Sequence, residues 1–75
     1  MFKNNLKVAR ERKGMSQLEL GRLTRIAPAN ISIIESGRQF PYPGWRKRIA
    51  AALKVSEEEL FPEEVQKDAK HKTHV

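Results

Sequence analysis

Residues that could ligate a metal or transfer a proton near neutral pH are few in this 75-residue chain. The two histidines, His71 and His74, have the H-x-x-H spacing that can bind a metal weakly on a helix. They lie in a polar segment without an apolar stripe, which favours a disordered tail instead. The carboxylates of Glu57–Glu59 suit the acidic first turn of a helix. We therefore expect no catalytic set, no metal site and no cofactor, and we interpret the chain as a non-enzyme.

The chemistry that the chain does carry is positive charge. Fifteen Lys and Arg against nine Asp and Glu give a net charge of +6. Seven basic against two acidic residues in 1–27 give +5, five against one in 28–55 give +4, and three against six in 56–75 give −3. A basic body suits a polyanionic partner such as nucleic acid. The alternative is that the charge only keeps a small domain in solution.

Length and composition point to one small domain. Seventy-five residues are too few for an enzyme core with a roomy pocket. The absence of cysteine excludes disulfides and thiolate metal sites, and it fits a reducing compartment. No signal peptide is visible, and no stretch approaches the roughly 20 apolar residues that span a membrane. We expect a cytoplasmic protein that does not enter a membrane.

Apolar spacing predicts five short helices and no strand, and hence an all-α bundle. The helices are expected over residues 5–13, from 16 to a turn at 24–27, over 28–36 and 43–54, and from 57 until Pro62. Ser16 and Glu19 have the spacing of a capping box, which recurs at Ser56, and Gly14 and Gly37 are well placed to stop helices. The side chains predicted to face the core are Leu6, Ala9, Lys13, Leu20, Leu23, Ile31, Ile34, Trp45, Ile49, Ala52, Leu53 and Phe61.

Residues 15–37, MSQLELGRLTRIAPANISIIESG, carry the pattern of two short helices joined by a tight turn. Such a pair needs a small residue where the backbones approach, and Gly21 provides one at about 1 kcal/mol of helix propensity. It also needs a sharp turn, here Thr24–Ala27, and apolar residues on the buried faces. Those residues are Leu20, Ile26, Ile31 and Ile34. The pattern favours a helix-turn-helix, whose second helix enters the major groove, over an ordinary helical hairpin that binds protein or nothing.

The chain resembles the Cro and phage-repressor family of bacterial helix-turn-helix regulators over about residues 6–61. The resemblance rests on M-S-Q-x-E-L at 15–20, I-E-S-G-R at 34–38, and L-K-V-S at 53–56 leading to Leu60 and Phe61. It implies a compact, lambda-repressor-like five-helix bundle with the third helix in the major groove. It also implies a homodimer on a near-palindromic operator of double-stranded DNA.

The resemblance also implies roles for single residues. Arg10 and Glu35 match a partly buried ion pair that holds the third helix in place without touching DNA. The residues implied to contact phosphates are Gln17, Arg38, Tyr42 and Arg46. We add Arg25 to this set from its own chemistry, because a guanidinium in the turn can reach a phosphate. The residues implied to face the bases are Pro28, Ala29, Asn30, Ser32 and Ile33.

Three features depart from the family pattern. Pro28, Ala29 and Ile33 cannot hydrogen-bond through their side chains, so we expect contacts with thymine methyl groups and a share of shape readout. The alternative is weak sequence preference. Arg25 stands where glycine is usual in the turn, which costs about 1 kcal/mol if the backbone stays left-handed. Ala27 stands where Ser or Thr is usual, so the third helix lacks a side-chain N-cap.

The sequence therefore predicts a sequence-specific transcriptional regulator, with a DNA-binding domain over residues 1–63 and a flexible polar tail over 64–75. Repression by promoter occlusion is favoured because no separate effector or activation domain is visible. We expect Lys54, Val55 and the last helix to form the dimer surface. Two alternatives stay open: an antitoxin that also binds a toxin protein, and a protein-interaction adapter that no longer binds DNA.

Overall fold

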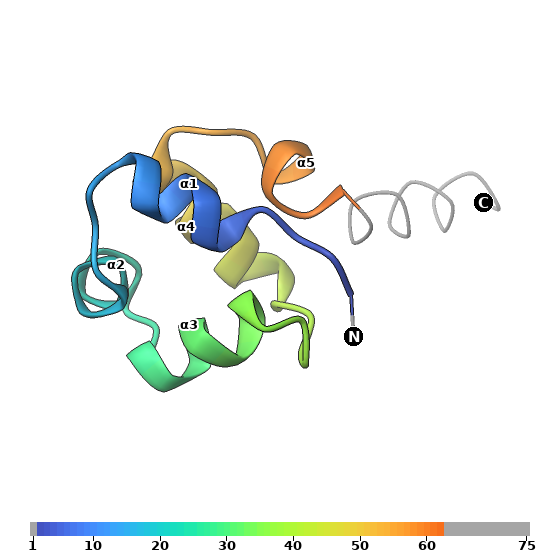
Figure 1. The fold of residues 1–75 in the computed structure, drawn as a ribbon, viewed down its shortest axis with the longest axis horizontal. Coiled ribbons are helices and arrows are strands. Elements are labelled where there is room, and N and C mark those ends of the chain that lie inside the picture. The colour runs from blue at the N-terminus through green and yellow to red at the C-terminus, as the bar shows by residue number, and fades with distance from the viewer. Residues whose placement is uncertain (1, 63–75) are drawn as a thin grey trace, which may run out of the picture.

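Five helices make up the structure. The computed structural model describes residues 2–62, which form α1 (Leu6–Arg12), α2 (Gln17–Thr24), α3 (Pro28–Glu35), α4 (Pro43–Leu53) and α5 (Glu57–Leu60) (Figure 1). No strand occurs within residues 2–62, and the predicted all-α bundle is confirmed. Each helix begins and ends within a residue or two of its predicted limits. The predicted tail over residues 64–75, with both histidines, lies outside the described residues.

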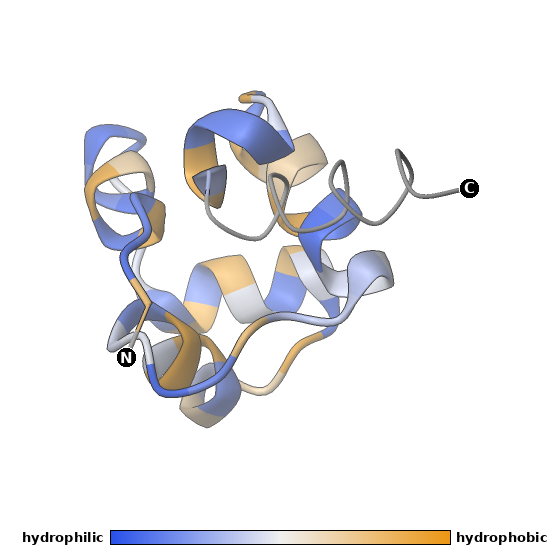
Figure 2. Ribbon diagram, turned by 90° about the vertical axis from the view of Figure 1, so that its right-hand side faces the viewer, coloured by the Kyte–Doolittle hydropathy of each residue, from blue (hydrophilic) through white to orange (hydrophobic). Residues whose placement is uncertain are grey.

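The helices pack around one apolar core. α2 contacts both α3 and α4, α4 also contacts α5, and α1 contacts α3. Figure 2 shows hydrophobic and hydrophilic residues on the same helices, as expected when one face of each helix enters a core. The fully buried apolar side chains include Leu6, Leu20, Ile31, Ile34, Ile49, Leu53, Leu60 and Phe61.

The predicted helix limits have local causes. The hydroxyl of Ser16 accepts from the backbone N–H of Glu19 at 3.0 Å, and the Glu19 carboxylate accepts from the Ser16 N–H at 2.9 Å. This completes the predicted capping box and lowers the pKa of Glu19, so the box stabilises the fold above the ordinary pKa of a glutamate and is lost as pH falls through the lowered value. At the start of α5, Ser56 accepts from a backbone N–H in the same way. Gly14 and Gly37 have φ of +68° and +80°, which confirms both stops.

The predicted core faces of three helices, α1, α2 and α4, differ from the structure. In α2 the buried residues are Leu20, Gly21 and Thr24, whereas Leu23 is 62% exposed. Lys13, at the end of α1, is exposed. An i, i+3 spacing predicts that two residues lie near each other on a helix, but not on which side of them the neighbouring helices pack. In α4 the buried face is centred on Ile49 and Leu53, with Arg46 and Ala50 beside them, and the predicted Trp45 and Ala52 are only half-buried.

The segment before α1 packs against the end of α3, which the sequence did not predict. The ring of Phe2 stacks on that of Phe40 with ring centroids 4.1 Å apart, and the backbone N–H of Phe2 donates to the carbonyl of Gly37 at 3.0 Å. The side-chain amide of Asn4 donates to the carbonyl of Ile34 at 2.9 Å. These contacts satisfy carbonyls at the C-terminal end of α3 and fix that end against the start of the chain.

The close approach at Gly21 leads to a stability prediction. A Cβ built on Gly21 would lie 2.7 Å from the carbonyl oxygen of Ile26 and 3.3 Å from Cγ of Pro28. We expect Gly21→Ala to destabilise the fold by about 1–3 kcal/mol through overpacking, net of its gain in helix propensity. Gly44 is the matched control, because its Cβ would meet nothing within 4 Å and Gly44→Ala should stabilise by up to about 1 kcal/mol. Urea denaturation of both variants measures this; equal stabilisation would mean that the helices do not approach at Gly21.

Candidate nucleic-acid interface

α3 keeps one face in the core and leaves the other uncovered. Ile31 and Ile34 are fully buried, as their spacing predicts. Ala27 at the N-cap makes no side-chain hydrogen bond, which confirms the missing cap. The residues predicted to face bases comprise three exposed residues, Pro28, Ala29 and Ser32, and two half-buried ones, Asn30 and Ile33. Since α3 lies at the edge of the molecule in Figure 1, this face is accessible to a large partner.

The turn from α2 to α3 contains a residue with a left-handed backbone. Arg25 has φ 59° and ψ 37°, a conformation that costs a non-glycine residue about 1–2 kcal/mol. The turn is anchored on both sides, because Ile26 is buried and the buried Thr24 hydroxyl donates to the carbonyl of Leu20 at 2.7 Å. The exposed guanidinium of Arg25 therefore projects from a fixed turn.

A buried ion pair joins α1 to α3. Nε of Arg10 lies 2.6 Å from Oε2 of Glu35, and Nη2 lies 3.2 Å from Oε1, which is a bidentate arrangement. The two side chains are only 10% and 5% exposed. The hydrogen bond that Arg10 donates to the Glu35 carboxylate is the largest of the effects that raise the pKa of Arg10 above its ordinary value. Nη1 also donates to the carbonyl of Met15 at 2.7 Å, so one guanidinium binds the last turn of α3 and the segment before α2.

The side chain of Gln17 belongs to the same network, which the sequence did not predict. Its Nε2 donates to Oε1 of Glu35 at 3.0 Å. A side-chain amide nitrogen carries two hydrogens, so the second N–H of Gln17 stays available to a phosphate. The first residue of α2 is thereby tied to the last residue of α3.

The other residues predicted to contact phosphates differ in their surroundings. Arg38 is exposed and follows Gly37, three residues beyond the end of α3. Tyr42 at the N-cap of α4 is 58% exposed. Arg46 requires a correction, because it is only 5% exposed and its Nε donates to Oε1 of Glu57 at 3.1 Å. Its guanidinium links α4 to α5 inside the fold, so we remove it from the phosphate-contacting set.

Residues 2–62 contain no group of three or more His, Cys, Asp or Glu placed to hold a metal ion. None of the helices among them is both long enough and apolar enough to cross a membrane.

Comparison with known proteins gives one positive finding. Residues 4–61 match a protein family described as a helix-turn-helix domain. This range includes all five helices. A search of curated proteins found no match to the chain.

Proposed function

Because the chain belongs to the helix-turn-helix domain family, we propose that it is a transcriptional regulator that binds double-stranded DNA in a sequence-specific way. Helix-turn-helix domains bind DNA. We further infer that this protein acts as a repressor by occluding a promoter. The observation that carries the proposal is the uncovered face of α3. That face is presented by a helix whose opposite side is fixed by Ile31, Ile34 and Glu35.

The size and composition of this face support docking in the major groove. A groove about 12 Å wide admits an α-helix, and its floor displays thymine methyl groups beside polar base edges. Ala29 and Ile33 offer small apolar surface for those methyl groups, and Asn30 can reach a polar edge. With so few hydrogen-bonding groups on the face, part of the specificity would come from DNA shape.

Phosphate contacts would flank the helix. Gln17, Arg25 and Arg38 lie at the start of α2, at the turn and after α3, and Tyr42 lies at the start of α4. Such contacts fix the register of a protein on the duplex without reading its sequence. They also agree with the basic charge of residues 1–55.

We infer that two copies act together on an inverted repeat. A single small domain makes few base contacts, and a dimer on two half-sites multiplies them. Lys54 and Val55, together with α5, remain the proposed dimer surface. Lys54 holds a left-handed backbone at φ 57°, and Val55 is half-buried beside it. Repression follows most simply if a dimer covers a promoter.

The proposal is tested by duplex binding at several salt concentrations. Fluorescence anisotropy with the full chain should show affinity that falls on the order of 10²-fold between roughly 50 and 200 mM salt, because bound phosphates release counterions. Affinity that ignores salt, or no binding to any duplex, would contradict it.

A change on α3 should alter base preference. Ala29→Gln adds an amide that can bond adenine in a bidentate way, worth about 1–3 kcal/mol of discrimination. We expect the selected sites to change at one or two base pairs. Ala51→Gln is the matched control, since Ala51 is an exposed alanine on α4, outside the surface proposed to contact DNA. If both variants select the same sites as the parent chain, α3 does not read the groove.

A protein partner is a second candidate function, favoured by the exposed leucines of α2. Leu18 is 52% and Leu23 62% exposed, although apolar side chains of this size are commonly buried. An antitoxin or an adapter would use such side chains against another protein. Salt-independent capture of a partner by the chain, abolished in Leu18→Ser with Leu23→Ser, would support this candidate.

A further inference from the structure

A cleft of about 260 Å³ opens where α1, α2 and α3 meet. It is lined by Lys7, Gln17, Ser32, Glu35 and Ser36. Lys7 lies in the first turn of α1, Gln17 begins α2, and the other three residues are in or just after the second half of α3. No sequence motif singles out Lys7, because only the packing of α1 on α3 brings it to this place.

The charges in the cleft favour an anion. Both oxygens of the Glu35 carboxylate already accept hydrogen bonds, one from Arg10 and the other from Arg10 and Gln17. The charge of Glu35 is therefore balanced by Arg10. Lys7 is exposed and forms no ion pair with any residue of 2–62. Its ammonium group is the uncompensated charge of the cleft.

Three different donors in the cleft can serve one acceptor group. The ammonium group of Lys7 has three N–H donors, and the amide of Gln17 has its second N–H. Ser32 is exposed, and its hydroxyl can rotate toward a ligand. The hydroxyl of Ser36 is different, because it donates to the carbonyl of Ile33 at 2.7 Å. An ammonium, an amide N–H and a hydroxyl suit the acceptor-only oxygens of a phosphodiester.

We propose that this cleft holds one phosphate of the DNA backbone, with Lys7 and Ser32 as binding residues beside Gln17. The inference rests on the proposed function and deepens it, because it assigns Lys7 a role and moves Ser32 from base reading to phosphate binding. Gln17 donates to Glu35 on α3, so a phosphate in the cleft would sit in fixed register with the bases below α3. The cleft then couples backbone contact to base reading.

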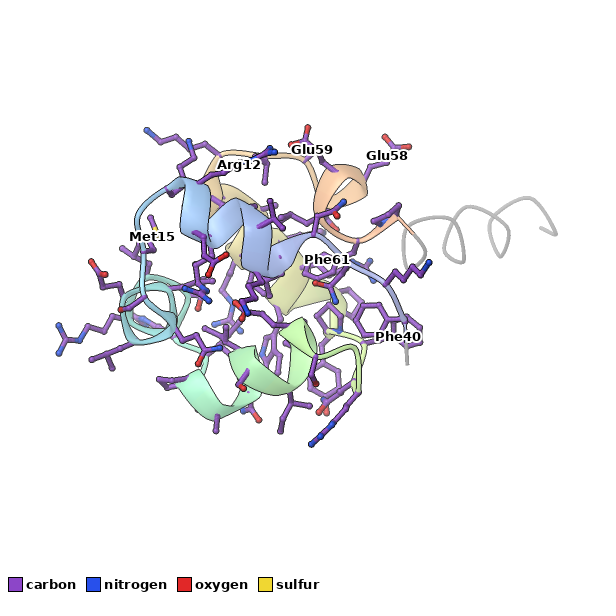
Figure 3. All side chains as sticks on the ribbon, viewed as in Figure 1. Arg12, Met15, Phe40, Glu58, Glu59 and Phe61 are labelled. Carbon is purple, nitrogen blue, oxygen red and sulfur yellow. The ribbon has the colours of Figure 1, made fainter. Side chains whose placement is uncertain are left out.

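The charge contribution of Lys7 is tested with a matched variant of α1. Lys7→Gln and Arg12→Gln each remove one exposed positive charge from the same helix. Arg12 lies on the side of the molecule away from α3 (Figure 3), where it lines the same hollow as Glu59. Binding of the full chain to a mixed-sequence duplex of about two helical turns is measured over a salt series. The slope of log affinity against log salt is negative, and we expect Lys7→Gln to make it less steep by about 0.9, the value for one phosphate. Arg12→Gln should leave the slope nearly unchanged.

The role of Ser32 is tested by site selection. Ser32→Ala should weaken binding several-fold and leave the selected base pairs the same, since a phosphate contact carries no sequence information. Equal slopes for Lys7→Gln and Arg12→Gln, or a change in the base pairs that Ser32→Ala selects, would overturn the cleft proposal while wild-type binding to DNA stays intact. If the wild-type chain bound no duplex, the proposed function would fail together with the cleft. Lys7, Arg12 and Ser32 are exposed, so circular dichroism should show parental folding for every variant.

Discussion

The Glu35→Ala variant is expected to have a free energy of unfolding about 3–5 kcal/mol below that of the parent chain. Removing this carboxylate leaves the guanidinium of Arg10 with its side chain only 10% exposed and without its ion-pair partner. It also removes the acceptor of the Gln17 amide. In a domain of this size such a loss corresponds to a fall in Tm on the order of 15 °C or more, which a thermal melt followed by circular dichroism would detect.

A double variant separates the unpaired charge from the lost contact. Arg10→Met with Glu35→Leu replaces the pair by apolar side chains of similar volume, and buried pairs replaced in this way often keep or gain stability. We expect the double variant to recover most of the loss. A Glu35→Ala protein with the parental Tm would mean that no buried pair exists between α1 and α3.

The second large effect is expected at Gly37. Its φ of +80° costs an alanine about 1–2 kcal/mol, and a Cβ there would also overlap the backbone carbonyl of Phe2. Gly37→Ala must therefore displace the segment before α1 and its stacking on Phe40. We expect a total loss of about 2–5 kcal/mol in the free energy of unfolding, measured by urea denaturation.

Gly14 provides the control for this prediction. It also has a left-handed backbone, at φ +68°, but a Cβ on it would meet nothing within 4 Å. Gly14→Ala should show only the conformational cost of about 1–2 kcal/mol. Equal losses for the two variants would show that the segment around Phe2 does not pack against Gly37 in solution.

The parts of the fold that the sequence predicted are those with local causes. A capping hydroxyl such as that of Ser16 acts within one turn of its own helix, and a glycine stop such as Gly37 depends on one backbone conformation. The i, i+3 spacing of Ile31 and Ile34 places both on one face of a single helix. Such features are visible in a few consecutive residues.

What the sequence did not predict depends on contacts between distant segments. Leu23 was assigned to the core, although α3 and α4 both pack on the other side of α2. Arg46 was assigned to phosphate, although the position of α5 brings Glu57 to its guanidinium. The packing of Phe2 on Phe40 and the position of Lys7 in the cleft join residues from different elements in the same way. Periodicity in one helix contains no information about these contacts.

The sequence predicted which residues belong to the candidate site better than it predicted the hydrogen bonds between them. The residues of α3 expected to face bases do lie on or beside its uncovered face, and the resemblance to phage repressors named the Arg10–Glu35 pair. It did not indicate that Gln17 bonds Glu35 as well, because this hydrogen bond requires the tertiary approach of α2 and α3. That bond links the predicted phosphate contact to the base-facing helix.

We propose that α3 reads the major groove of double-stranded DNA as part of a dimer. Selection of binding sites from a random duplex library with the purified chain tests this most directly. We expect an inverted repeat whose half-sites lie about one helical turn apart, with thymines where Ala29 and Ile33 contact the groove. Weak binding to every duplex with no enriched sequence would contradict it.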